Sequence, residues 1–133
     1  MARAASRAPL WTHIACFVDE SDASATALRE AARLRASEAC RLSVVYVAVG
    51  PPHDVPPPPP AWLEGAATEA GGHPVLLVNL GQAAAAATSW AEGARADLVV
   101  ASAHRGVRER LMLGSFAGYL ARHAPCPVLL VRP

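Results

Sequence analysis

Residues 13–22, HIACFVDESD, join a short apolar run to an acidic turn, and this combination decides the fold. A strand that is buried on both faces has such a nearly continuous apolar sequence. An alanine-rich segment with apolar residues at helical spacing follows as far as about Ala36, and Ser21 or Asp22 can cap its start. Residues 42–49, LSVVYVAV, then repeat the apolar and β-branched pattern. The sequence therefore predicts a strand, a helix and a second strand parallel to the first.

The same alternation continues to the end of the chain. We expect strands over residues 74–80, 97–102 and 127–131, and helices over residues 61–70, 81–94 and 115–123. Helices that alternate with buried strands form right-handed crossovers and cover both faces of a parallel sheet. The sequence thus predicts an α/β fold in one doubly wound domain that spans residues 1–133.

One segment has a different composition. Residues 50–60 contain seven prolines, five of them consecutive at Pro56–Pro60. Proline can neither continue a helix interior nor donate to a sheet, so we expect a stiff, polyproline-like surface loop. It is too short to separate domains, and a role as a lid over a site remains open.

Composition and charge exclude several classes of protein. The chain has a formal net charge of +1 and no lysine, which excludes Schiff-base chemistry and a P-loop and gives no basic surface for duplex nucleic acid. The apolar stretches are shorter than a membrane span, and no secretory signal precedes the first strand. We therefore expect a cytoplasmic protein. Three cysteines, widely spaced in apolar sequence, favour reduced thiols over a disulfide framework or a zinc site.

Ligands of parallel sheets bind beyond the carboxyl ends of the strands, where the strand order reverses. In this chain those ends are Asp19, residues 47–50, residues 80–81 and residues 101–104. Asp19 can accept hydrogen bonds from ribose hydroxyls or hold a metal ion. Alternatively, it belongs to a polar cluster that caps the following helix.

Residues 101–115, ASAHRGVRERLMLGS, are the second candidate segment. Gly114 and Ser115 open a helix whose free N–H groups and dipole favour an anion, and Arg105 lies in the same loop. A solvated run of charges is the alternative. No serine, cysteine or carboxylate stands at a spacing that would make His104 a catalytic base, so we do not expect an enzyme.

Four segments together resemble the universal stress protein family from about His13 to Arg132. They are FVDESDASATALREAARL (17–34), LSVVYV (42–47), ADLVVASAHRGVRERLMLGS (96–115) and ARHAPCPVLLVR (121–132). The resemblance implies a five-stranded parallel sheet of order 3-2-1-4-5 and a homodimer. It also implies a site for ATP, which many members bind through G-x-x-G-x9-G-[ST] between the fourth strand and the fourth helix.

The resemblance transfers to single residues only in part. The acidic residue after strand one matches Asp19, and Val47 matches the position whose backbone receives adenine. Gly114 and Ser115 match the end of the motif, whereas Ala101 and His104 stand where the first two motif glycines belong. We expect the following residues to bind the nucleotide: Asp19, Val47, Ala101, His104, Arg105, Gly114, Ser115 and Phe116. A left-handed backbone at His104 would cost about 1–2 kcal/mol.

Two functions follow as hypotheses. The first is a cytoplasmic stress-response protein that binds an adenine nucleotide, ATP with Mg²⁺ or another, with weakened affinity and without catalytic turnover. The second is an interaction module of the same fold that binds no nucleotide. In both, the apolar edge at residues 127–131, which has no lysine to prevent pairing, predicts a homodimer through strand five.

Overall fold

The computed structural model describes residues 8–51, 54–55, 57–104 and 113–132. The strands in these residues are β1 (His13–Phe17), β2 (Arg41–Val49), β3 (His73–Asn79), β4 (Leu98–Ser102) and β5 (Val128–Val131). The helices are α1 (Asp22–Glu38), α2 (Ala61–Ala70), α3 (Ala83–Gly93) and α4 (Ser115–His123). The predicted elements are all present, with bounds that differ by at most two residues.

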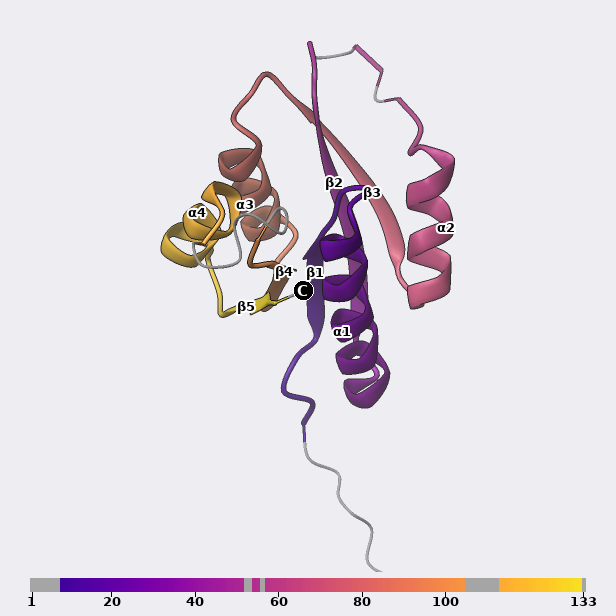
Figure 1. The fold of residues 1–133 in the computed structure, drawn as a ribbon. Coiled ribbons are helices and arrows are strands. Elements are labelled where there is room, and N and C mark those ends of the chain that lie inside the picture. The colour runs from indigo at the N-terminus through magenta and orange to yellow at the C-terminus, as the bar shows by residue number, and fades with distance from the viewer. Residues whose placement is uncertain (1–7, 52–53, 56, 105–112, 133) are drawn as a thin grey trace, which may run out of the picture.

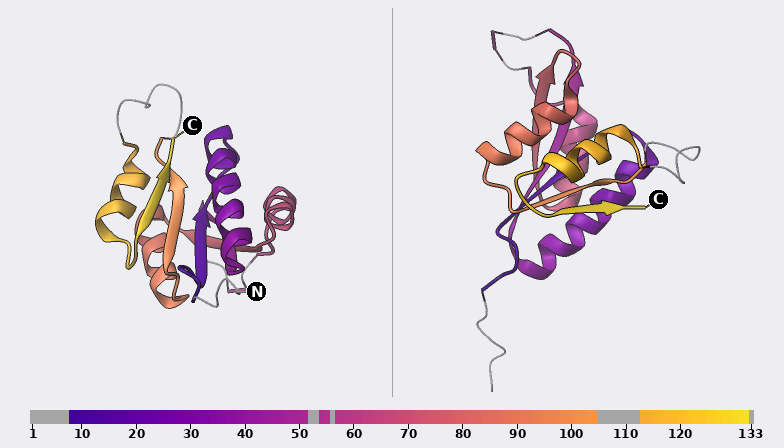
Figure 2. Two further views of the ribbon diagram at one scale, coloured as in Figure 1. Left: turned by 90° about the horizontal axis from the view of Figure 1, so that it is seen from below. Right: turned by 90° about the vertical axis from the view of Figure 1, so that its left-hand side faces the viewer.

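The five strands form one parallel sheet in the order β3-β2-β1-β4-β5, which confirms the predicted topology. The winding direction reverses between β1 and β4. Helices α1 and α2 cover one face of the sheet, and α3 and α4 cover the other (Figures 1 and 2).

Each face of the sheet has its own apolar core, and β1 contributes to both. Ile14 and Cys16 pack on the side of α1 and α2, whereas Ala15 and Phe17 pack on the side of α3 and α4. Because successive side chains of a strand point to opposite faces, a strand buried on both sides must be apolar at every position. This explains the uninterrupted apolar run that begins the fold.

Local signals in the sequence set the helix ends. The Ser21 side chain caps α1 by accepting a hydrogen bond from Ser24 N at 3.2 Å. Gly71 ends α2 with a left-handed backbone (φ 77°), which glycine adopts without a steric cost. A Cβ atom at Gly72 would lie 2.8 Å from the Leu42 carbonyl oxygen, so α2 can meet β2 this closely only with glycine there.

The proline-rich segment, residues 50–60, connects β2 to α2, and its described residues lie outside helices and strands. Cys16, Cys40 and Cys126 are free thiols, and burial raises the pKa of Cys16 to about 12. Among the described residues, no helix is long and apolar enough to cross a membrane.

A carboxylate joins the amino-terminal ends of β1 and β4. Asp97 accepts hydrogen bonds from the backbone N–H groups of Thr12 and His13, both at 2.9 Å, and from the Thr12 hydroxyl at 2.8 Å. Burial alone would raise the pKa of Asp97, but these hydrogen bonds outweigh it and hold the pKa below its usual value. The Asp97 side chain therefore fixes two segments that are far apart in the sequence.

His13 lies beside this carboxylate with 4 % of its surface exposed. Its Nδ1 is 3.1 Å from the Ala94 carbonyl oxygen, and its Nε2 is 2.7 Å from the Ser43 hydroxyl. Only a protonated Nδ1 can donate to a carbonyl, so in the neutral ring Nε2 accepts from Ser43. Burial lowers the pKa of His13 below its ordinary value of 6.5, although Ala94 and Asp97 act in the opposite direction.

We expect the protein to lose stability in mild acid because of His13. The pKa of the His13 imidazole is lower in the folded protein than in the unfolded chain, so the unfolded chain binds a proton on this ring more readily. The stability that neutral His13 contributes is therefore complete above about pH 6.5 and is lost as the pH falls. Urea unfolding of His13→Gln should show a flatter dependence of the free energy of unfolding between about pH 7 and pH 5. The matched control, His73→Gln at an exposed histidine, should keep the slope of the parent. Equal slopes for the parent and His13→Gln would contradict the assignment.

Candidate functional site

A cleft of about 850 Å³ opens at the carboxyl ends of β1, β2 and β4, beside the start of α4. Its size is in the range of small-molecule sites. The cleft lies where the crossover from β1 and the crossover from β4 leave the sheet on opposite faces. This is the topological switch point of the fold, where parallel sheets bind their ligands.

The turn between β1 and α1 forms one wall of the cleft. Ser21 N donates to Asp19 Oδ1 at 2.8 Å, and Asp19 N donates to the buried Ser24 hydroxyl at 2.8 Å. Asp19 therefore belongs to the polar cluster at the start of α1, as one of the two interpretations proposed. It also lines the cleft, as the other requires. The two interpretations are compatible, because an ionised carboxylate can accept several hydrogen bonds at its two oxygens.

The wall formed by the sheet and α4 is largely apolar and aromatic. Phe17 and Phe116 line the cleft and meet edge to face, with ring centroids 6.0 Å apart. Tyr46 and Val47 of β2 line it as well. The Tyr46 ring packs edge to face on Trp62 of α2 at 5.0 Å. This wall suits a flat, largely apolar ring system.

The chain after β4 forms the opposite wall and is closed into a tight turn. The Ser102 hydroxyl donates to the His104 carbonyl oxygen at 2.6 Å and accepts from His104 N at 3.3 Å. Among the described residues other than glycine, only Ala39 and Arg95 have a positive φ. His104 therefore does not adopt the left-handed backbone whose cost was considered from the sequence, and this turn does not require the conformation for which the motif uses glycine.

Helix α4 begins at the cleft with Gly114 as its cap residue, in an extended conformation and without a side-chain cap. The Gly114 N–H donates to the Ala103 carbonyl oxygen at 3.0 Å, which joins the start of α4 to the turn after β4. The first amides of a helix carry a partial positive charge. An anionic group of a ligand would therefore be attracted to Ser115 and the residues after it.

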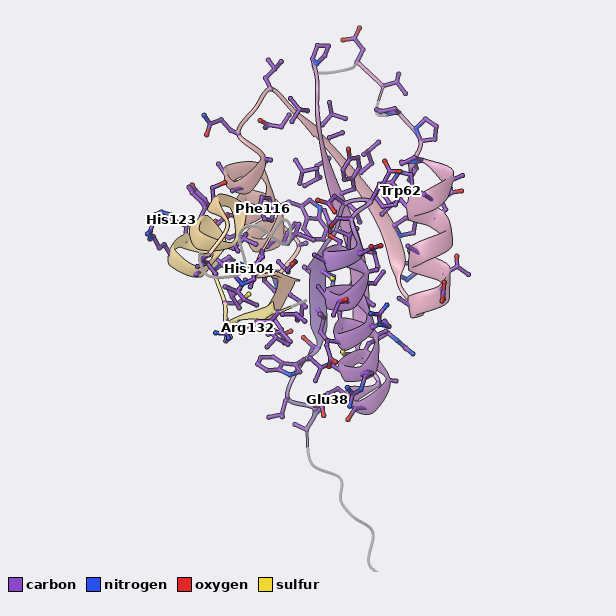
Figure 3. All side chains as sticks on the ribbon, in the orientation of Figure 1. Glu38, Trp62, His104, Phe116, His123 and Arg132 are labelled. Atoms are coloured by element: carbon purple, nitrogen blue, oxygen red, sulfur yellow. The ribbon has the colours of Figure 1, made fainter. Side chains whose placement is uncertain are left out.

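The structure brings the expected residues together. Seven of the eight line this cleft: Asp19, Val47, Ala101, His104, Gly114, Ser115 and Phe116. The eighth, Arg105, lies outside the described residues. Figure 3 shows His104 and Phe116 on the α4 side of the molecule, and Trp62 on α2 on the other side. That these residues bind a nucleotide stays a prediction.

The eight expected residues do not include several others that line the cleft, among them Tyr46, Ser24 and Ser102. Tyr46 could have been found, because it lies next to Val47 at the end of the second strand. Ser24 is only 6 % exposed, and its role depends on the turn geometry before α1. The Ser102 contact with His104 likewise depends on a local turn that the sequence pattern does not specify.

The described residues provide little for a bound metal ion alone. No group of three His, Cys, Asp or Glu side chains with metal-binding geometry occurs among them. Asp19 is the carboxylate that lines the cleft. Mg²⁺ is commonly held by one or two carboxylates together with substrate phosphates and water. Asp19 could therefore contribute to a magnesium site only in company with a bound phosphate.

A second hollow, of about 560 Å³, lies between α1 and α2 and shares the Asp19–Ser24 turn with the cleft. Its walls include Leu28, Ala32, Trp62 and Ala66. None of the described residues that line it comes from the end of β4 or the start of α4, where further polar groups of the cleft converge. The cleft is therefore the stronger candidate for the functional site.

Comparison with known proteins identifies relatives of this arrangement. The defining pattern of the Universal stress protein family matches residues 11–132. A universal stress protein family structure from Burkholderia pseudomallei has 28 % sequence identity and a TM-score of 0.67, over 90 % of this chain and 95 % of that one. A search of curated proteins finds none that matches.

Two further structures of similar fold are complexes with nucleotides. The universal stress protein from Archaeoglobus fulgidus in complex with dAMP has 22 % identity and a TM-score of 0.68, over 91 % of this chain and 98 % of that one. A universal stress protein in complex with cAMP has 20 % identity and a TM-score of 0.69, over 91 % of this chain and 97 % of that one. At these identities the likeness concerns the fold.

We expect the wall formed by the β1–α1 turn to depend on Ser24. Ser24→Ala removes the acceptor of Asp19 N and should lower the free energy of unfolding by about 1 kcal/mol, because the partly buried Asp19 amide loses its hydrogen bond. Ser37→Ala, at an exposed position of the same helix, is the matched control and should leave stability within about 0.5 kcal/mol of the parent. Urea denaturation measures both. Equal stabilities would show that the Ser24 hydroxyl does not support the turn.

Proposed function

The chain belongs to the universal stress protein family, and from this premise we propose that it binds an adenine nucleotide in the cleft. It acts in the stress response through the bound and free states of this cleft, without catalytic turnover. The observation that carries the proposal is the convergence of an apolar wall, a carboxylate and a helix start in one cleft of suitable size. The dAMP and cAMP complexes of the two related structures support the class of ligand.

Each part of an adenine nucleotide has a matching part of the cleft. The base lies against the aromatic wall, where the backbone of Val47 reads its polar edge. Asp19 accepts hydrogen bonds from the ribose hydroxyls, or holds Mg²⁺ together with the phosphate. The phosphate lies at the start of α4, where Ser115 adds a hydroxyl to the helix amides. Arg105 follows the β4 turn in sequence and can add a positive charge there.

A second function is favoured by one specific observation. Ala101 and His104, 2 % and 7 % exposed, stand at the positions where ATP-binding members of the family have glycine. A buried imidazole beside the helix start reduces the room for phosphate. In this alternative, the fold serves as a dimeric interaction module, and the cleft binds no nucleotide.

Calorimetric titration with AMP, cyclic AMP, ADP and ATP, each with Mg²⁺, separates the two functions. If the cleft binds a nucleotide, Asp19→Asn should weaken the affinity about tenfold or more, because a charge-assisted hydrogen bond is lost. The amide oxygen of Asn can still accept the hydrogen bond from Ser21 N, so the turn should persist. Asp22→Asn, which makes the same charge change outside the cleft lining, is the control and should bind like the parent. Absence of binding by all four nucleotides at millimolar concentration would favour the interaction module.

We also propose that the protein is a homodimer through β5. This strand lies at one end of the sheet, next to β4 alone. Val128 and Leu130 pack into the core beneath α3 and α4, whereas Leu129 is 38 % exposed. An apolar edge strand without charged side chains favours pairing with another chain. The sequence leaves open whether Val128 and Leu130 or Leu129 and Val131 form the shared face, and the exposure of Leu129 favours the second pair.

Leu129→Arg should therefore convert the dimer to a monomer, because two desolvated guanidinium groups would meet near the dimer axis. Leu80→Arg places the same charge on an exposed leucine between β3 and α3 and should leave the dimer intact. Sedimentation velocity across the micromolar range measures the assembly. A parent protein that stays monomeric, or a Leu129→Arg variant that stays dimeric, would contradict pairing through β5.

A further inference from the structure

We propose that His104 selects nucleotides by the length of the phosphate chain, so that the cleft takes an adenosine monophosphate or cyclic monophosphate in preference to ATP. The inference rests on the proposed function, because it concerns the ligand of the same cleft. It makes the residue that departs from the family motif the determinant of specificity, rather than a defect in an ATP site.

The charges of the cleft determine where the phosphate of a ligand lies. Asp19 lines the wall formed by the β1–α1 turn and repels an anion. The start of α4 carries a partial positive charge of about half a unit and attracts one. Where no metal ion bridges the two, a phosphate is therefore driven away from Asp19, toward the region between the end of β4 and the start of α4.

His104 lies in this region. It lines the cleft, is 7 % exposed, and follows Ala103, whose carbonyl oxygen accepts the hydrogen bond from Gly114 N at 3.0 Å. This hydrogen bond brings the turn after β4 directly against the first residues of α4. A residue with a full imidazole at this point takes up volume that glycine would leave to the second and third phosphates of ATP.

The backbone of this wall is also held in place. The Ser102 hydroxyl accepts a hydrogen bond from His104 N and donates one to the His104 carbonyl oxygen. Ala103 N donates to the Val131 carbonyl oxygen at 2.9 Å. Displacing the turn to admit a longer phosphate chain would break several of these hydrogen bonds. The backbone at His104 has no positive φ, so such a displacement would relieve no strain there.

Titration of the parent with AMP, cyclic AMP and ATP tests the proposal directly. AMP or cyclic AMP should bind at least about tenfold more tightly than ATP, because the His104 side chain takes up volume that the second and third phosphates need. In His104→Gly the affinity for ATP should rise about tenfold, while the affinity for AMP changes less than about threefold. His123→Ala, at an exposed histidine of α4, should leave both affinities unchanged. His104→Ala is a second variant, which removes the imidazole but keeps the Cβ atom and so avoids the added backbone freedom of glycine.

The outcomes separate this inference from the proposed function. If neither the parent nor the variants bind any nucleotide, the proposed function itself fails. If the parent binds ATP as tightly as AMP, the cleft binds nucleotides but His104 does not select them, and this inference is overturned. The ratio of AMP to ATP affinity in the parent decides this even if both His104 variants fail to fold, which thermal melts would show.

Discussion

Burial of β1 on both faces is the constraint on which the rest of the structure depends. This strand has β2 on one side, β4 on the other, α1 and α2 above one face and α3 and α4 above the other. All five of its residues are buried, including the polar His13. A charged side chain at any of these positions would lose its hydration without room for a partner. The two cores, the helix layers and the position of the cleft all follow from this strand.

The two ends of the central strands β1 and β4 have different roles in the structure. At the amino-terminal end, Asp97 and His13 satisfy backbone and side-chain groups that would otherwise be buried without partners. At the carboxyl-terminal end, the crossovers that follow β1 and β4 run to opposite faces of the sheet, and none of the described helices covers the space between them. The amino-terminal end therefore contributes to stability. The carboxyl-terminal end borders the cleft, which results from the reversal of the strand order.

The fold could be predicted from the sequence because its signals are local. Apolar runs mark the strands, Ser21 caps α1, and Gly71 ends α2. The positions of the cleft residues could be predicted as well, because the strand ends of a parallel sheet lie at one edge. The interactions within the cleft could not. The hydrogen bonds of Ser102 with His104 depend on a local turn that the sequence pattern does not specify, and the hydrogen bond between Asp97 and Thr12 depends on the pairing of β1 with β4.

These differences explain how family membership can determine the place of a site without determining its ligand. The cleft exists because the strand order reverses, whatever residues follow the strands. Its selectivity depends on the side chains that line it, of which some, such as Phe17, belong to a core and others follow the strands. Ala101 is still part of the core beneath α3 and α4, whereas His104 lies beyond the last residue of β4. A substitution at His104 therefore changes what the cleft admits more than it changes what holds the sheet together.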